Sequence, residues 1–183
     1  VALAVELERP SRLDFGEYYS PYYSLMNLLA FEMAPCVAVE LGVEKGRGAI
    51  SLCEGASSCR VFGIDTQDRE ELAVVGRRYP NFTFILSPST LWGIPEKIPL
   101  QIDILHIDTE HSYSMAKAEF ELYSPRLRDG GVVLFDDLHA AEDDVQRYFD
   151  ELPYDKIADD RLHAVVGYGV LVYKKEKDNG NAL

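Results

Sequence analysis

Basic residues and long apolar runs are scarce in this sequence. Its 183 residues include 18 Lys and Arg against 31 Asp and Glu, which gives a formal net charge of −13. Such an acidic surface repels phosphate backbones and anionic lipids, so we expect neither nucleic acid nor a membrane among the partners. No apolar run approaches the length of a membrane span, and no charged and then apolar signal opens the chain.

Cysteine is also rare, and the cysteines present lack the spacing of metal ligands. Cys36, Cys53 and Cys59 are odd in number and do not form the paired motifs of zinc sites. We expect reduced, structural thiols, which are usual in reducing compartments. The cysteine pattern therefore predicts a cytoplasmic protein.

Repeats, low-complexity tracts and Pro/Gly-rich linkers are absent as well, so no pattern divides the chain. A length of 183 residues is enough for one buried core. We therefore expect a single domain, with a helical segment over 1–35 that can form a lid, a core over 36–173 and a polar tail over 174–183. No pattern encodes the oligomeric state, and a homo-oligomer stays open.

Short apolar segments recur along the chain and predict strands. Five of them are separated by helical patterns and cover 37–41, 61–65, 82–86, 102–107 and 132–135. The last two strands, near 156–158 and over 164–173, are too close for a helix between them and should form a hairpin. This order predicts an α/β fold with a doubly wound, mostly parallel seven-stranded sheet and an antiparallel C-terminal hairpin. Such sheets bind ligands beyond the carboxyl ends of their strands.

Two helix starts have recognisable signals. Ser20 followed by Pro21 resembles a capping hydroxyl with proline at the first helical position. Asp68 with Glu71 has the spacing of a capping box for the helix behind the second strand. These signals predict helices before the first strand and after the second.

A glycine-rich turn follows the first strand. Gly42, Gly46 and Gly48 have the spacing G-x-x-x-G-x-G, which differs from the dinucleotide-binding G-x-G-x-x-G. Asp65, about 20 residues further on, ends the second strand, where a carboxylate can accept both hydroxyls of a ribose. Glu40 before the turn could meet a cationic ligand and would repel a pyrophosphate. The turn therefore favours S-adenosylmethionine over NAD, although a tight strand-to-helix turn alone would also explain the glycines.

Aspartates follow two strands that should be neighbours. Asp108 ends the fourth strand, and Asp136 with Asp137 ends the fifth. Neighbouring strand ends lie about 5 Å apart, so these carboxylates should converge and repel one another unless a cation joins them. Oxygen ligands favour Mg²⁺, with Mn²⁺ or Ca²⁺ as alternatives. The other interpretation is helix capping, which aspartate often performs after a strand.

Histidines accompany the aspartates. His111 follows Asp108 by three residues, and beside a metal it could take a proton from a bound hydroxyl near neutral pH. His139 is a weaker candidate that could orient a metal ligand. His163 is expected to be structural or merely exposed.

Taken together, these residues resemble a known group, the small class I S-adenosylmethionine-dependent O-methyltransferases. The chain is similar to the macrocin-type sugar O-methyltransferases and the cephalosporin-pathway methyltransferase-like family over roughly residues 36–173. The resemblance is carried by Glu40-Leu41-Gly42 with Gly46-Arg47, Gly63-Ile64-Asp65, Asp108-x-x-His111-Ser112-Tyr113, and Gly130-Gly131 with Asp136-Asp137.

The resemblance implies a Rossmann-like fold, a metal-assisted mechanism and a set of residue roles. In such enzymes the positions of Asp108, Asp136 and Asp137 hold Mg²⁺, which lowers the pKa of an acceptor hydroxyl, and the position of His111 is the catalytic base. The cofactor, S-adenosylmethionine, would be held by the residues at the carboxyl ends of the first three strands, Glu40, Gly42, Gly46, Gly48, Asp65 and Ser89. The acceptor would be a small hydroxylated molecule such as a sugar, phenol or polyketide.

The chain also departs from that group. Gly48-Ala49 stands where relatives carry a hydroxyl residue, and Thr109-Glu110 replaces a glycine and a small polar residue. Tyr18, Tyr19, Tyr22 and Tyr23 could form a lid over the acceptor or simply pack on the sheet, and Trp92 could pack on adenine or fill a gap.

Three rival functions stay open. They are a nicotinamide-dependent oxidoreductase, a non-catalytic binding module on the same fold, and a metal-independent methyltransferase whose aspartates only cap helices.

Overall fold

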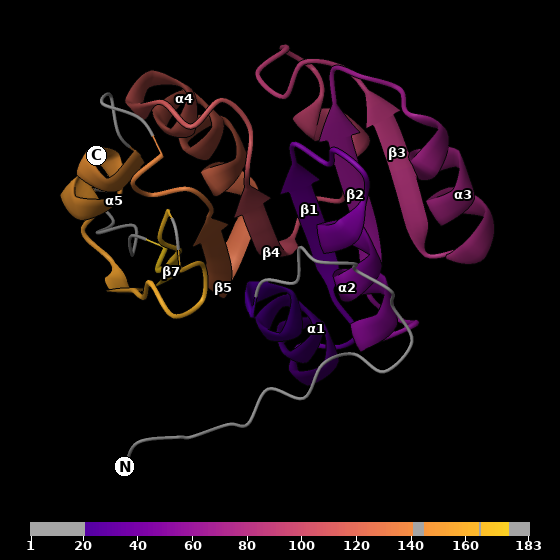
Figure 1. Cartoon of the computed structure of the whole chain (residues 1–183), viewed down its shortest axis with the longest axis horizontal. Coiled ribbons are helices and arrows are strands. Elements are labelled where there is room, and N and C mark those ends of the chain that lie inside the picture. The colour runs from indigo at the N-terminus through magenta and orange to yellow at the C-terminus, as the bar shows by residue number, and fades with distance from the viewer. Residues whose placement is uncertain (1–20, 141–144, 165, 176–183) are drawn as a thin grey trace, which may run out of the picture.

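The computed structural model describes residues 21–140, 145–164 and 166–175. At its centre lies a seven-stranded sheet, whose strands appear as arrows in Figure 1. The strand order is β3-β2-β1-β4-β5-β7-β6. β7 is antiparallel to both of its neighbours, and the other pairings are parallel. The strands are β1 (Val37–Leu41), β2 (Arg60–Asp65), β3 (Phe82–Leu86), β4 (Ile102–Ile107), β5 (Leu127–Phe135), β6 (Asp155–Ala158) and β7 (Gly169–Val172). The predicted fold class is confirmed.

Helices cover both faces of this sheet. They are α1 (Tyr22–Glu32), α2 (Arg47–Gly55), α3 (Glu70–Arg78), α4 (Tyr113–Tyr123) and α5 (Val145–Glu151). One buried cluster contains side chains of α1, α2 and α3, and a second contains those of α4 and α5. Figure 1 shows α1 beside α2, and α4 beside α5 at the other side of the molecule. Among the described residues, no helix combines the length and apolarity that crossing a membrane requires.

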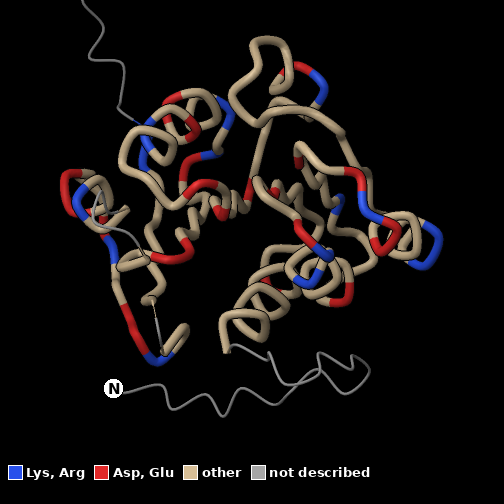
Figure 2. The backbone as a smooth tube through the Cα atoms, turned by 45° about the horizontal axis from the view of Figure 1, so that its top comes forward, with Lys and Arg blue, Asp and Glu red and all other residues tan. Residues whose placement is uncertain are grey.

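The acidic excess is spread over the molecule. Figure 2 shows Asp and Glu in both halves of the chain, with Lys and Arg interspersed among them. The charge is therefore distributed along the fold and is not confined to one tail.

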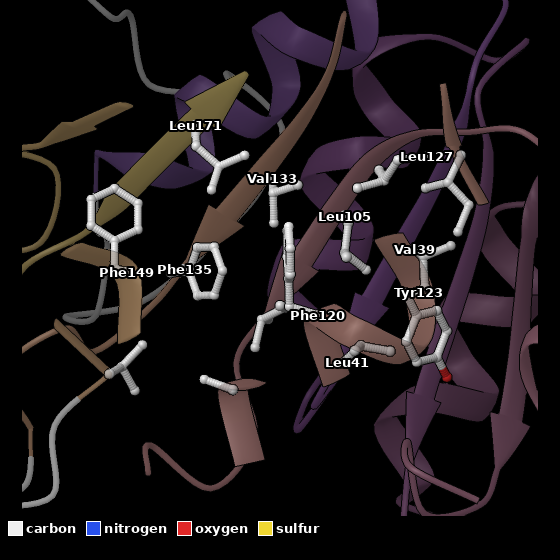
Figure 3. Packing of buried hydrophobic residues seen from close by; sticks show 14 of the residues in the cluster. Val39, Leu41, Leu105, Phe120, Tyr123, Leu127, Val133, Phe135, Phe149 and Leu171 are labelled. Carbon is white, nitrogen blue, oxygen red and sulfur yellow. The ribbon is translucent and has the colours of Figure 1, made fainter. Parts of the chain in front are cut away.

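Side chains of the central strands point alternately to the two faces of the sheet and so contribute to both hydrophobic clusters. Ala38 and Ile104 point into the first cluster, while Val39 and Leu105 point into the second, since successive strand residues face opposite sides. Figure 3 shows the second cluster, where Phe135 of β5 packs near Phe149 of α5. Each buried side chain of this size contributes roughly 1.5–3 kcal/mol, so these cores fix the strand ends that carry the polar residues.

Four local predictions are wrong. Pro21 is the N-cap of α1 and not its first helical residue, and β5 begins at Leu127, five residues before the predicted start at 132. α3 begins at Glu70, with Arg69 at its N-cap and no side-chain capping bond, so Asp68 and Glu71 do not form a capping box. The last strand covers Gly169–Val172, which is shorter than the predicted 164–173. Ser20, like Tyr18 and Tyr19, lies outside the described residues.

The cysteine prediction agrees with the structure. Cys36, Cys53 and Cys59 are all buried and form no disulfide. Burial raises the pKa of Cys53 to about 12, so this thiol is protonated and unreactive near neutral pH.

Candidate functional site

A cleft of about 630 Å³ lies at the carboxyl ends of the parallel strands. Its walls come from the loops after β1, β2, β3, β4 and β5, together with Tyr22 and Tyr23 of α1 and His163. The chain diverges here, because β1 continues to β2 on one side while β4 pairs with β1 on the other. Open α/β sheets bind ligands at such a switch point. The sites predicted from the sequence therefore meet at one edge of the sheet.

Seven of the ten predicted site residues line this cleft. They are Gly42, Asp65, Ser89, Asp108, His111, Asp136 and Asp137. The other three are buried and do not line the cleft: Glu40 belongs to β1, Gly46 is the N-cap of α2 and Gly48 lies in its first turn.

Gly42 lets the first loop approach β4 closely. Its φ is +82°, and a Cβ atom there would lie 1.7 Å from the carbonyl oxygen of Asp108. Its N–H also donates to the carbonyl oxygen of Ile64 at 2.9 Å. No side chain fits this position, so only glycine allows the glycine-rich loop to pack directly against the end of β4 at Asp108.

Asp65 holds the glycine-rich loop in place. Its Oδ2 accepts hydrogen bonds from the backbone N–H groups of Val43 and Glu44 at 2.9 and 3.0 Å. Its Oδ1 accepts one from the N–H of Gln67 at 2.9 Å. The carboxylate therefore organises the loop while it also lines the cleft.

Glu40 is buried and does not line the cleft. It is 2% exposed, and its Oε1 lies 3.2 Å from Nδ1 of His106, its register partner on β4. A Cβ atom on Gly48 would lie 1.8 Å from the same oxygen. A side chain at position 48 would therefore collide with the Glu40 carboxylate, so this position requires glycine. Burial raises the pKa of Glu40.

The three predicted metal ligands converge. Ligand oxygens of Asp108 and Asp136 lie within 4.8 Å of one another and of a ring nitrogen of His106, and Asp136, Asp137 and His163 form a second such group. Consecutive strand residues point to opposite faces, so Asp136 and Asp137 can share a site only where the strand ends. Asp137 has a φ of +53°, a left-handed conformation that is uncommon outside glycine and concentrates at functional sites.

His111 lies between two of these carboxylates. Its Nε2 is 3.2 Å from Asp108 Oδ1 and its Nδ1 is 3.0 Å from Asp137 Oδ2. Hydrogen bonds to Asp108 and then Asp137 raise the pKa of His111 to about 10. The protonated ring therefore neutralises part of the negative charge of Asp108 and Asp137.

The predictions for His139 and His163 are both wrong. His163, which we expected to be structural or exposed, lies at the aspartates, with Nδ1 2.8 Å from Asp136 Oδ1 and 3.4 Å from Asp137 Oδ1. His139, expected near the metal, instead pairs with Asp160 at 3.4 Å. The hairpin of β6 and β7 brings His163 to the cleft, and no local sequence pattern marks this.

A buried carboxylate that the sequence analysis missed supports the opposite wall. Glu119 of α4 is fully buried and accepts hydrogen bonds from Ser89 Oγ at 2.5 Å and Thr109 Oγ1 at 2.9 Å. Burial raises the pKa of Glu119 to about 7. Its place on the apolar face of α4, beside Ala116 and Phe120, is the signal that could have identified it.

The aromatic candidates have separate outcomes. Tyr22 and Tyr23 are buried and line the cleft, so the first turn of α1 both packs on the fold and closes the site. Trp92 is 85% exposed and is not among the residues that line the cleft, so it does not fill a gap in the described structure.

A family comparison identifies the central part of the chain. The profile of a methyltransferase domain matches residues 39–138, which is more than half of the 183 residues. An uncharacterised protein, y4gI of Sinorhizobium fredii, is 28% identical over a stretch that covers 76% of this chain. That stretch is 17% of the relative's own length.

Solved structures with the same fold include methyltransferases of differing chemistry. A Staphylococcus aureus protein assigned to the caffeoyl-CoA O-methyltransferases has a TM-score of 0.66 at 17% identity, covering 86% of this chain and 85% of its own. The MycE methyltransferase of mycinamycin biosynthesis, with Mg and S-adenosylhomocysteine, has a TM-score of 0.65 at 14% identity, covering 92% and 53%. The 1,6-didemethyltoxoflavin-N1-methyltransferase of Burkholderia thailandensis has a TM-score of 0.62 at 16% identity, and the match covers 86% of this chain and 77% of its own. At these identities the likeness establishes the fold alone.

Proposed function

Because the chain belongs to the methyltransferase domain family, matched over residues 39–138, we propose that it methylates a hydroxyl oxygen of a small molecule. The methyl donor is S-adenosylmethionine, and a divalent cation assists. The observation that carries the proposal is the convergence of Asp108, Asp136 and Asp137 with His111 in the same cleft as the glycine-rich loop.

The cofactor half of the cleft is assigned to the loops after β1, β2 and β3. We assign Asp65 to the ribose hydroxyls, as acidic residues at the end of a second strand often bind them, and Gly42 to the cleft wall beside Asp108. Ser89, supported by Glu119, forms the wall assigned to adenine. Gly46 and Gly48 shape the start of α2, whereas Glu40 lies behind the loop and is left out of the proposed contacts.

The metal half is assigned to the aspartates. Asp136 lies in one group with Asp108 and in a second with Asp137, and carboxylates this close repel one another. The rings of His111 and His163 and the backbone N–H of Asp137 offset part of that repulsion. Hard divalent ions such as Mg²⁺ select oxygen ligands of this kind, so the residues fit a cation. When bound, such a cation supplies a positive charge that lowers the pKa of an acceptor hydroxyl.

His111 is proposed as the base. Both of its nitrogens face carboxylates of the metal half, and the residue lines the cleft in which the acceptor would bind. Tyr22 and Tyr23 close that space and exclude water. Holding the acceptor beside the methyl donor replaces a bimolecular encounter and accounts for much of the rate enhancement.

The same proposal covers partners and location. The net charge of −13, with acidic residues scattered along the backbone (Figure 2), supports a small molecule over nucleic acid or a membrane as the partner. Three buried cysteines without a disulfide support a cytoplasmic location.

Calorimetric titration of S-adenosylmethionine and Mg²⁺, each alone and together, tests the assignment. We expect native protein to bind both, and Asp136→Asn to lose the Mg²⁺ signal while keeping cofactor affinity within about 3-fold. Asp160→Asn, a change at an exposed aspartate outside the cleft, is the matched control and should keep both signals.

Other outcomes separate the rivals. Cofactor binding with no metal signal would favour a metal-independent methyltransferase. Binding of both without S-adenosylhomocysteine release from sugar, phenol or polyketide acceptors would favour a binding module. Binding of NADH in place of S-adenosylmethionine would favour the oxidoreductase.

A further inference from the structure

A buried carboxylate–imidazole pair lies directly behind the aspartates. Glu40 on β1 and His106 on β4 are register partners, so their side chains stand on the same face of the sheet about 5 Å apart. His106 is 1% exposed and Glu40 is 2% exposed. His106 Nδ1 lies 3.2 Å from Glu40 Oε1, which fixes the ring orientation.

The other ring nitrogen has no partner. Within the described ranges, His106 Nε2 is buried and makes no hydrogen bond. A buried polar atom without a partner loses its hydration and gains nothing in return. A ligand that supplies an electron-pair acceptor at Nε2 would remove this penalty, because a neutral imidazole that donates from Nδ1 has a free lone pair on Nε2.

Asp108 and Asp136 indicate where an electron-pair acceptor for Nε2, a metal ion, would bind. A ring nitrogen of His106 lies within 4.8 Å of ligand oxygens of both Asp108 and Asp136, which is near enough for small side-chain shifts to bring all three onto one ion at metal–ligand distances of about 2.0–2.2 Å. Because Nδ1 faces Glu40, Nε2 is the nitrogen that remains to bind. A carboxylate that orients a histidine toward a metal is a recurrent arrangement in metal sites.

We propose that His106 Nε2 is a ligand of the ion held by Asp108 and Asp136, that Glu40 is its positioning residue, and that the ion is a first-row transition divalent cation. The proposal rests on the proposed function, which places a cation at the aspartates, and it names a ligand and a metal class there. Imidazole nitrogen suits Zn²⁺, Co²⁺, Ni²⁺ and Fe²⁺, whereas Mg²⁺ prefers oxygen. The pair also gives Glu40 a role distinct from cofactor binding.

The direct test is ¹⁵N NMR of the full chain labelled at its four histidines. The His106 signals are assigned by elimination from His111→Gln, His139→Gln and His163→Gln, so no variant of the buried His106 is needed. We expect Zn²⁺ to shift the Nε2 signal of His106 at stoichiometric metal while Nδ1 keeps its proton. Mg²⁺ should leave the His106 signals in place.

The outcomes separate this inference from the proposed function. Zn²⁺ binding that Asp136→Asn abolishes, with an unshifted His106 Nε2, would overturn the inference and leave the metal site intact. No binding of Zn²⁺, Mn²⁺ or Mg²⁺ in protein that binds S-adenosylmethionine would overturn both the metal site and the inference, while methyl transfer without metal would survive.

Variants give a second readout. His106→Gln should weaken Zn²⁺ binding about 10–100-fold and change Mg²⁺ binding less than about 3-fold, with S-adenosylmethionine affinity as the check of folding. Glu40→Gln should weaken Zn²⁺ binding about 10-fold while the His106 shift persists, and Glu40→Asp should recover part of the loss. Equal weakening of Zn²⁺ and Mg²⁺ in His106→Gln would indicate a structural role and contradict the proposal.

Discussion

The two halves of the cleft use carboxylates in opposite ways. Asp65 accepts three backbone N–H groups, so its charge is satisfied by the fold before any ligand arrives. Asp108, Asp136 and Asp137 face one another and share two histidines. Asp65 is therefore held in place by the fold without a ligand, whereas the three aspartates carry excess negative charge that a cation would neutralise.

Aspartate-to-asparagine substitutions, one in each half, should give the largest difference between the metal half and the cofactor half. Asp137→Asn removes a negative charge from the metal half, so we expect methyl transfer to fall about 100-fold or more with S-adenosylmethionine affinity unchanged within about 3-fold. Asp65→Asn leaves backbone donors facing an amide, so cofactor affinity should fall about 10-fold and stability by about 1–3 kcal/mol, with metal binding retained. Kinetics measures methyl transfer, calorimetry measures the binding of S-adenosylmethionine and of metal, and urea unfolding measures stability. Equal losses of affinity for both ligands in either variant would break the comparison.

Gly42 is the point where the halves touch. Gly42→Ala places a Cβ 1.7 Å from the Asp108 carbonyl oxygen at a φ of +82°, so we expect a loss of about 2–5 kcal/mol from clash and strain together. Gly130→Ala is the matched control, with a φ of +75° and nothing within 4 Å of the added atom, and should lose about 1 kcal/mol. Urea unfolding of both variants measures the two losses of stability. Similar losses would mean that the positive φ, and not the contact with β4, determines the destabilisation by Gly42→Ala.

Glu119 should make the cofactor wall sensitive to pH. Its pKa is raised from 4.5 to about 7 in the folded protein, so the protonated form is favoured by folding. The stabilisation is fully present below about pH 4.5 and is lost as pH rises to about 7, a change of about 3 kcal/mol. Glu119→Gln cannot titrate, so its stability relative to native protein should improve by that amount between pH 4.5 and 7.5 in urea unfolding. Glu121→Gln changes an exposed position of the same helix, and its stability should depend on pH in the same way as that of native protein.

Trp92 should have the smallest effect. At 85% exposure, Trp92→Ala should change stability by less than about 0.5 kcal/mol and S-adenosylmethionine affinity by less than about 2-fold in calorimetry. A larger loss of affinity would add Trp92 to the cofactor half and revise its boundary.

Much of this fold is predictable because burial leaves a local signature. The predicted segments 37–41, 82–86 and 102–107 agree with β1, β3 and β4 as observed, since each is an apolar run bounded by polar or turn residues. The convergence of Asp108 with Asp136 also follows from strand order, because β4 and β5 are neighbours in a parallel sheet. The failed capping box at Asp68 shows that a local motif does not hold when the helix starts elsewhere.

The sequence by itself determined the layered α/β fold, the glycine-rich loop and the acidic strand ends, since each depends on residues close together in the chain. Only the tertiary structure decided that Glu40 faces His106, that His163 reaches Asp136 and that Glu119 supports Ser89. These pairs lie 66, 27 and 30 residues apart, and their contacts depend on strand register, a hairpin and helix rotation. The physical reason is that pairing across a sheet is set by packing of the whole core, which no local pattern records.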